Sequence, residues 1–198
     1  HSAVTVFGAM VLKHDTSQFD IYCYSSAASG DSITDRLREG VTAWRDVSIW
    51  DDDRLEQQIR ADEIDILVDL SGHSNGNRMP LFARKPAPVQ VTAWGYITGT
   101  GLDAMDYIFA DADTIRPDEE QWYAEEVVRL PRIVSYWPAD GEQVGPVGPS
   151  PYLRNGFLTY GVMNRLGKLK PDVIGLWARI LKAVPDARLI VKAAGLDD

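Results

Sequence analysis

The sequence predicts an α/β fold with a Rossmann-like parallel sheet that carries helices on both faces. Short apolar segments typical of strands alternate with segments whose apolar residues recur at helical spacing, which is the pattern of parallel sheets. The alternation stops over residues 138–151, which hold four prolines and three glycines. A strand–helix–strand pattern then resumes. We therefore expect two α/β units, 1–137 and 152–198, joined by a linker at 138–151.

The first unit is expected to begin with a helix over 3–12, where apolar residues recur at helical spacing. A doubly wound domain usually begins with a strand at the sheet centre, so we expect that strand to precede residue 1. The run from Ile64 to Leu70 predicts a buried strand over 64–70. The other expected elements are helices at 32–39, 52–62, 79–84 and 117–125, and strands at 19–25, 46–50, 89–94, 106–110 and 127–130.

The second unit is expected to form a strand over 157–161, a helix over 171–184 and a strand over 188–193. The helix carries a strong apolar stripe that includes Ile174, Trp177 and Leu181. A single β-α-β has too little surface to bury its own core. We therefore expect this unit to be the first β-α-β of a longer second lobe.

Composition narrows the function classes. The net charge of −9 argues against a nucleic-acid backbone or an anionic membrane as the main partner. No apolar run approaches the ~18 residues of a membrane span. The single cysteine, Cys23, excludes an internal disulfide and a cysteine-based metal site. We interpret Cys23 as a buried strand residue, and a reducing, cytoplasmic location fits this cysteine usage.

The first candidate site is the segment that follows the strand at 64–70. Ligands of open α/β sheets bind at the carboxyl ends of the strands. Gly72 would let the backbone approach a ligand, and His73 could act as acid, base or hydrogen-bond donor near neutral pH. The alternative is a glycine-containing turn with a structural histidine, and position alone favours neither interpretation.

The second candidate site is the loop at 95–101, which also follows a strand. Its three glycines and two threonines, with Tyr96 and Thr98 among the loop residues, could line a pocket. The alternative is a flexible surface loop. The G-x-G-x-x-G spacing of a dinucleotide fingerprint is absent and no helix follows directly, so this signal is weak.

The third candidate site joins the strand at 157–161 to the helix at 171–184. Pro171 suits the first helical position, so the loop leads into a helix N-terminus whose unpaired N–H groups attract phosphate. Arg165 and Lys168 would add positive charge on the same loop. The alternative is a basic surface turn, which residue chemistry alone favours slightly.

Two acidic clusters could in principle hold a divalent cation under a sugar nucleotide. One is the run Asp51 to Asp53 and the other is the pair Asp111 and Asp113. The first run opens an expected helix, where aspartates act as caps and as partners of the helix dipole. We therefore favour capping over metal binding.

Taken together, several segments resemble the catalytic region of the O-GlcNAc transferase/SPINDLY family. They are Asp65 to His73 with Asn77 and Arg78, Arg84 to Val91, Trp94 to Tyr96, Met105 to Ile108, and Gly156 to Pro171. The resemblance implies a GT-B architecture, in which two Rossmann-like lobes face a cleft and the second lobe binds the donor nucleotide. It also implies transfer of a sugar, with inversion, to serine or threonine of proteins. Neither a metal nor a cofactor beyond the sugar nucleotide is expected.

The same resemblance assigns roles to individual residues. Lys168 matches the lysine that contacts the donor diphosphate and stabilises the leaving group. His1 matches a histidine near the sugar and the acceptor, and His73 lies on a loop expected to face the cleft; the general base stays unassigned. The expected catalytic residues are therefore Lys168, His1 and His73, and the expected donor-binding residues are Asn164, Arg165, Lys168, Gly72, Tyr96 and Thr98.

The sequence departs from the family pattern at a few positions. Arg165 stands where an amide residue is usual, and Ile97 and Thr98 stand where a Pro-Gly or Pro-Asn pair is usual. The later elements of the second lobe are not in the sequence, so we expect the 198-residue chain alone to have little or no activity. The expected partners are a nucleotide sugar and an acceptor protein, with tetratricopeptide repeats possible upstream.

The donor and the activity stay open at this point. UDP-GlcNAc is the expected donor and GDP-fucose the alternative. Two other functions compete: a different sugar-nucleotide enzyme on the same fold, such as an epimerase, and a non-catalytic interaction module that retains the fold. The segments Arg84 to Val91 and Met105 to Ile108, which resemble the transferase family, argue against an epimerase.

Overall fold

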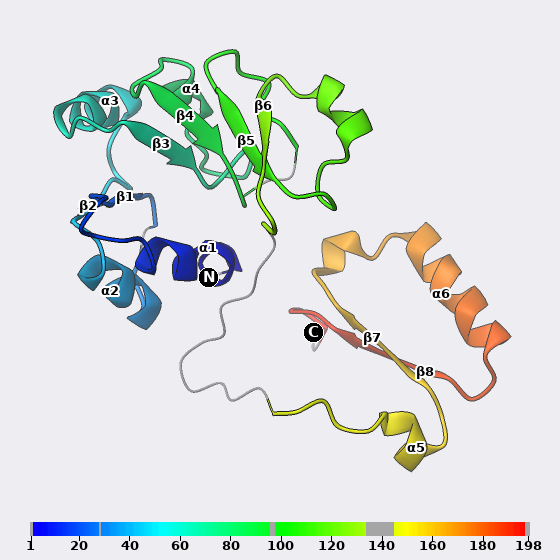
Figure 1. Ribbon diagram of the computed structural model, residues 1–198. Helices are drawn as coiled ribbons and strands as arrows, with labels where there is room; N and C mark the ends of the chain where they lie inside the picture. Colours follow the sequence, from blue (N-terminus) through cyan, green and yellow to red (C-terminus); the bar gives the residue numbers. More distant parts are fainter. Residues whose placement is uncertain (1, 28, 96–97, 134–144, 197–198) are drawn as a thin grey trace. The chain divides into compact units, whose positions relative to one another are not determined.

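The computed structural model describes residues 2–27, 29–95, 98–133 and 145–196. The chain folds into two compact units, His1–Glu142 and Gln143–Asp198 (Figure 1). Part of the predicted linker at 138–151 lies outside the described residues.

The described residues of the first unit form parallel strands, as the alternating pattern predicted, but the strands lie in two sheets and not in the single sheet expected. β1 (Tyr22–Ser25) pairs with β2 (Ala43–Asp46), and a separate four-stranded sheet has the order β3-β4-β5-β6. Figure 1 shows the strands of this second sheet side by side in sequence order. They are β3 (Ile66–Asp69), β4 (Val89–Thr92), β5 (Tyr107–Ala110) and β6 (Glu126–Arg129). All their pairs are parallel, so their carboxyl ends lie at one edge.

Helix α3 (Asp52–Ala61) begins where the sequence predicts a cap. The side chain of Asp51 accepts from Arg54 N at 2.9 Å and starts α3. Asp52 and Asp53 form ion pairs with Arg78 and Arg84. This confirms the capping interpretation of the acidic run. The remaining helices of the first unit are α1 (Ser2–Leu12), α2 (Ser32–Glu39), α4 (Met79–Phe82) and the 3-10 helix η1 (Pro117–Trp122).

One core joins α3 and α4 to the strands. Leu55 and Ile59, one turn apart on α3, are both buried in it. Its other buried members are Val47, Leu67, Met79, Leu81, Phe82, Ala87 and Met105. Tyr24 and Trp50 pack against the same cluster, so it also links the β1–β2 segment to the larger sheet.

Two of the segments that carry the family resemblance, Arg84 to Val91 and Met105 to Ile108, stabilise the fold itself. Gln90, fully buried in β4, donates from Nε2 to Phe82 O at 2.9 Å and to Ala104 O at 2.8 Å. Lys85 Nζ lies 2.5 Å from the carboxylate of Asp106, which also accepts from Gln90 N at 2.7 Å. These contacts tie the start of β4 to the start of β5, so the motif residues here stabilise the sheet.

Three expectations about the first unit need correction. The strand expected at 46–50 lies at 43–46, because Val47 N donates to Ser25 O at the end of the β1–β2 pair and a turn follows. The strand at 64–70 is buried on one face only: Ile66 and Val68 are 56% and 37% exposed, since alternate side chains point to opposite faces. The helix expected at 117–125 is a 3-10 helix that ends before Tyr123.

Cys23 lies in β1, as expected, but it is only half-buried. Burial raises the pKa of its thiol to about 11. A thiol with so high a pKa is a poor nucleophile near neutral pH, which agrees with a packing role for this residue.

The second unit is the β-α-β that the sequence predicts. β7 (Thr159–Met163) and β8 (Arg188–Lys192) pair in parallel, and α6 (Pro171–Ala183) connects them. A short helix, α5 (Pro151–Asn155), precedes β7 and was not predicted. The side chain of Ser150 caps it and Gly156, with φ of 75°, ends it. No residue of α6 is buried in this unit.

Within the described part of the chain, every helix is too short or too polar to cross a membrane.

The core makes a prediction with a matched control. Ile59 is 1% exposed, whereas Ile49 is 90% exposed. Ile59→Ala leaves a cavity and should lower the free energy of unfolding by about 2–5 kcal/mol. Ile49→Ala should change it by less than about 0.5 kcal/mol. Urea denaturation followed by circular dichroism measures both, and equal losses would mean that the core is not centred on α3.

Candidate functional site

The carboxylate of Asp69 organises the end of β3. It is buried, and it accepts hydrogen bonds from Ser71 N at 3.0 Å, Gly72 N at 2.9 Å and Thr92 Oγ1 at 2.8 Å. Gly72 has φ of 50°, a conformation that favours glycine. One side chain therefore fixes the turn after β3 and joins that turn to the end of β4.

The loops after β3 and β4 lie directly against each other. A Cβ built on Gly95 would stand 2.1 Å from Leu70 O, which is far inside van der Waals contact. Only glycine permits this approach. The first two candidate segments of the sequence, around Gly72 and around Gly95, are thus neighbours in the fold.

His73 is held by the same pair of loops. Its side chain is exposed, and its Nε2 lies 3.0 Å from Thr100 O. A carbonyl oxygen only accepts, so Nε2 must carry the proton in this hydrogen bond. The predicted residue therefore meets a second loop rather than standing alone in a turn.

Thr100 is anchored in turn by Glu125, which the sequence analysis did not select. Thr100 N donates to Glu125 Oε1 at 2.6 Å, and the Thr100 hydroxyl donates to the same oxygen. Glu125 directly precedes β6 and is 4% exposed. A glutamate before a short apolar strand carries no distinctive sequence signal, because only the fold shows that it is buried.

The other predicted residues of the first unit are placed less fully. Thr98 is exposed on the loop after β4. Tyr96 and His1 lie outside the described residues. The structure thus brings Gly72 and His73 together with Thr100 and Glu125, and it leaves the predictions for Tyr96 and His1 untested.

The remaining candidate residues form a cationic turn in the second unit. Asn164, Arg165 and Lys168 are all exposed between β7 and α6. Arg165 N donates to Asn164 Oδ1 at 3.0 Å, and Lys168 N donates to Arg165 O at 3.0 Å. Neither cation forms an ion pair with a residue that the structure describes. Lys170 occupies the N-cap of α6 without a side-chain cap.

Asp111 and Asp113, the other acidic candidates, belong to a turn after β5. Asp111 accepts from the backbone N–H groups of Ile133, Thr114 and Asp113 at 2.9, 2.9 and 3.1 Å. These bonds, that of Ile133 above all, lower the pKa of Asp111 to about 2. No three His, Cys, Asp or Glu side chains of the described residues converge as metal ligands would.

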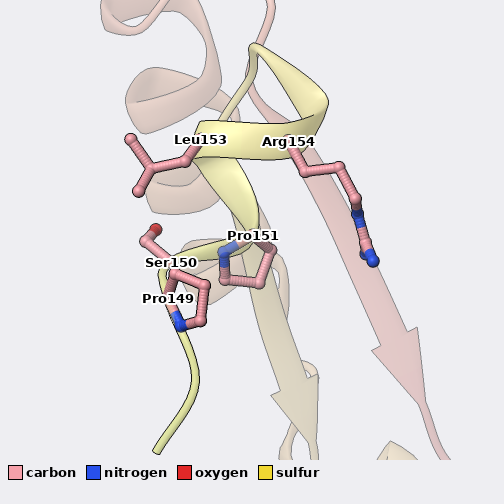
Figure 2. A pocket seen from close by; sticks show the side chains of 5 residues that line it. All are labelled: Pro149, Ser150, Pro151, Leu153 and Arg154. Atoms are coloured by element: carbon pink, nitrogen blue, oxygen red, sulfur yellow. The ribbon is translucent and has the colours of Figure 1, made fainter.

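A shallow hollow in the second unit does not coincide with any predicted residue. It has a volume of about 290 Å³ and is lined by Pro149, Ser150, Pro151, Leu153 and Arg154 (Figure 2). Its wall is the five-residue helix α5. The candidate residues of the turn before α6 do not line it.

These features define the class of the protein: a Rossmann-like α/β protein with loops gathered at the ends of parallel strands and a cationic turn before a helix. The model of glycosyl transferase family 41 matches residues 1–143. The chain belongs to this family, which confirms the resemblance on which the site assignment rests.

Individual relatives agree with the family. The chain is 42% identical over 97% of its length to a tomato (Solanum lycopersicum) protein named probable UDP-N-acetylglucosamine–peptide N-acetylglucosaminyltransferase SPINDLY, and covers 21% of it. It is 28% identical over 96% of its length to the Arabidopsis thaliana protein SEC, of which it covers 20%. A solved Thermobaculum terrenum O-GlcNAc transferase mutant matches all of the chain, at 40% identity and a TM-score of 0.86, over 37% of its own length. The chain thus spans about a fifth of the length of the tomato and Arabidopsis proteins.

A substitution that adds one methyl group tests the contact between the loops after β3 and β4. Gly95→Ala forces its Cβ against the backbone carbonyl of Leu70, so we expect a loss of about 1–3 kcal/mol in unfolding free energy. Gly148→Ala is the control, because its Cβ would meet nothing within 4 Å. Both are measured by urea denaturation. A Gly95 variant as stable as the Gly148 variant would contradict the described loop contact.

The lowered pKa of Asp111 predicts that the stability of the fold depends on pH. Its carboxylate has a folded pKa of about 2, below the ordinary value of 3.8, so the ionised form contributes stability above pH 4 that is lost as the pH falls toward 2. The difference in unfolding free energy between the wild type and Asp111→Asn should be largest above pH 4 and should shrink between pH 4 and pH 2. A difference that is constant across this range would contradict the assignment.

Proposed function

We propose that the protein transfers a sugar, GlcNAc from UDP-GlcNAc, to serine or threonine of other proteins with inversion at the anomeric carbon. Family membership supports a glycosyltransferase, and the names of the relatives specify peptide N-acetylglucosaminyl transfer. The single observation that carries the proposal is the exposed amine of Lys168 on the turn that leads into α6.

The charge on this turn suits a diphosphate. Arg165, Lys168 and Lys170 fall within six residues that contain no acid, and the first N–H groups of the 13-residue helix α6 follow. A helix N-terminus attracts phosphate. Lys168 would neutralise the charge that grows on the leaving diphosphate as the glycosidic bond breaks, where electrostatic stabilisation matters most. With this cation in place, the proposed reaction requires no metal and no further cofactor.

The first unit would supply the sugar and acceptor side. Gly72 and His73 lie on the ordered turn after β3, with Thr98 on the loop after β4. His73 is a candidate acid or base. His1 is the other histidine proposed to act in catalysis, and Tyr96 is proposed to bind the donor. Asn164 and Arg165 would contact the nucleotide from the second unit.

The wider setting belongs to the same proposal. The acceptor is a protein, held in the whole molecule by other parts such as tetratricopeptide repeats, and the reaction is cytoplasmic. A chain with one cysteine does not need an oxidising compartment. The chain supplies one nucleotide-fold unit and the opening of another, so we expect it to show little or no transfer by itself. Measurable sugar transfer by the purified 198-residue chain would contradict that expectation.

Donor-dependent thermal stabilisation of the whole protein tests the function. At a donor concentration about 100-fold above Kd, UDP-GlcNAc should stabilise the wild type by about 2.7 kcal/mol. Lys168→Ala should lose most of this shift, because the diphosphate loses its cation. Lys182→Ala, which removes an amine from the last turn of α6, should keep it.

A second set of measurements identifies the donor and tests whether Lys168 acts in the transfer step. GDP-fucose in place of UDP-GlcNAc identifies the alternative donor if it alone gives the shift. In the transfer assay, Lys168→Ala should lower kcat by about 10²–10³-fold. A Lys168 variant that keeps both the shift and the rate would disprove the diphosphate assignment.

A further inference from the structure

The carboxylate of Glu125 is buried, and its hydrogen bonds to the described residues all involve Thr100. Its Oε1 accepts from both the N–H and the hydroxyl of Thr100, whereas its buried Oε2 has no hydrogen-bond partner in the described part of the chain. Burying a charged group with one oxygen unpaired is costly. Among the described residues, the Glu125 carboxylate therefore accepts hydrogen bonds from Thr100 alone, on the loop after β4.

Every polar atom of Thr100 takes part in a hydrogen bond. Its N–H and hydroxyl donate to Glu125, its Oγ1 accepts from Leu102 N at 3.2 Å, and its carbonyl oxygen lies 3.0 Å from His73 Nε2. Gly99 and Gly101 flank it, and Gly101 has φ of 72°. Glycine neighbours would leave the direction of the Thr100 carbonyl free, so the bonds to Glu125 are what orient it toward His73.

We propose that Glu125 is a positioning residue that acts through Thr100 on His73. The oriented carbonyl holds the proton of His73 on Nε2. In the neutral ring the lone pair then lies on Nδ1, so any proton that His73 takes up is taken up at Nδ1. The inference rests on the proposed function, in which His73 takes part in sugar transfer, and it adds the reacting atom and the residue that selects it.

The tautomer of His73 is the direct readout. NMR of the ¹⁵N-labelled chain, without donor and above the ordinary histidine pKa of about 6.5, reports which ring nitrogen carries the proton. His73→Gln and His14→Gln assign the signals among the three histidines. In the wild type we expect protonated Nε2, unprotonated Nδ1 and a slowly exchanging Hε2.

Three variants at two neighbouring positions separate positioning from general stability. Glu125→Ala should give a mixture of tautomers and fast exchange of Hε2. Glu125→Gln should keep the wild-type signature, since its amide oxygen still accepts from Thr100. Glu126→Gln is the charge-matched control on the exposed side of β6 and should change nothing. A wild-type signature in Glu125→Ala, or its loss in Glu125→Gln, overturns the proposal.

A second substitution keeps the test decisive if Glu125→Ala does not fold. Thr100→Val retains the backbone groups and the shape of the side chain but removes the hydroxyl. Hε2 exchange of His73 should then be about 5- to 10-fold faster, the equivalent of one hydrogen bond. An unchanged exchange rate in a folded Thr100→Val chain also overturns the proposal.

Kinetics of the whole protein separate this inference from the proposed function. Glu125→Ala should lower kcat by about 10- to 100-fold through misplacement of His73, with KM for the donor nearly unchanged. An equal loss in Glu125→Gln would overturn the positioning role. If the ring signature depends on Glu125 while Lys168→Ala still keeps its donor shift, the diphosphate assignment fails and the positioning of His73 stands.

Discussion

The arrangement of the first unit depends on the buried carboxylate of Asp69. Three donors from two segments meet it, the N–H groups of Ser71 and Gly72 and the hydroxyl of Thr92. Burying a carboxylate costs free energy unless hydrogen bonds compensate it. The Asp69 carboxylate gains all three of its hydrogen bonds only if the turn after β3 reaches the end of β4. The close approach of Gly95 to Leu70 completes the same junction.

Buried carboxylates recur around the sheet with similar roles. Glu125 accepts from the backbone and hydroxyl of Thr100, and Asp111 accepts from three backbone N–H groups after β5. Each carboxylate orders a loop by accepting hydrogen bonds from its backbone N–H groups. Glycine-rich loops that are held by such hydrogen bonds can present a side chain such as His73 in a defined direction.

The proposed site of the second unit depends on exposed charge and not on buried groups. Its cationic turn is exposed, and Lys168 stands there without an ion pair to any described residue. A net charge of −9 over the chain does not prevent this, because the field at a site depends on the nearest charges and on the helix end. The overall acidity and a local anion site are therefore compatible.

The sequence by itself determined the parallel α/β pattern, the cap at Asp51, the β-α-β of the second unit and the family, because periodicity, turn residues and motifs are local properties. It also placed Gly72 and His73 directly after a strand, which is β3 in the structure, for the same reason. Only the tertiary structure decided that Ile66 and Val68 are exposed, that β2 ends before Val47, and that Glu125 reaches His73 through Thr100. Burial and contacts between distant residues arise from packing, which no local pattern encodes.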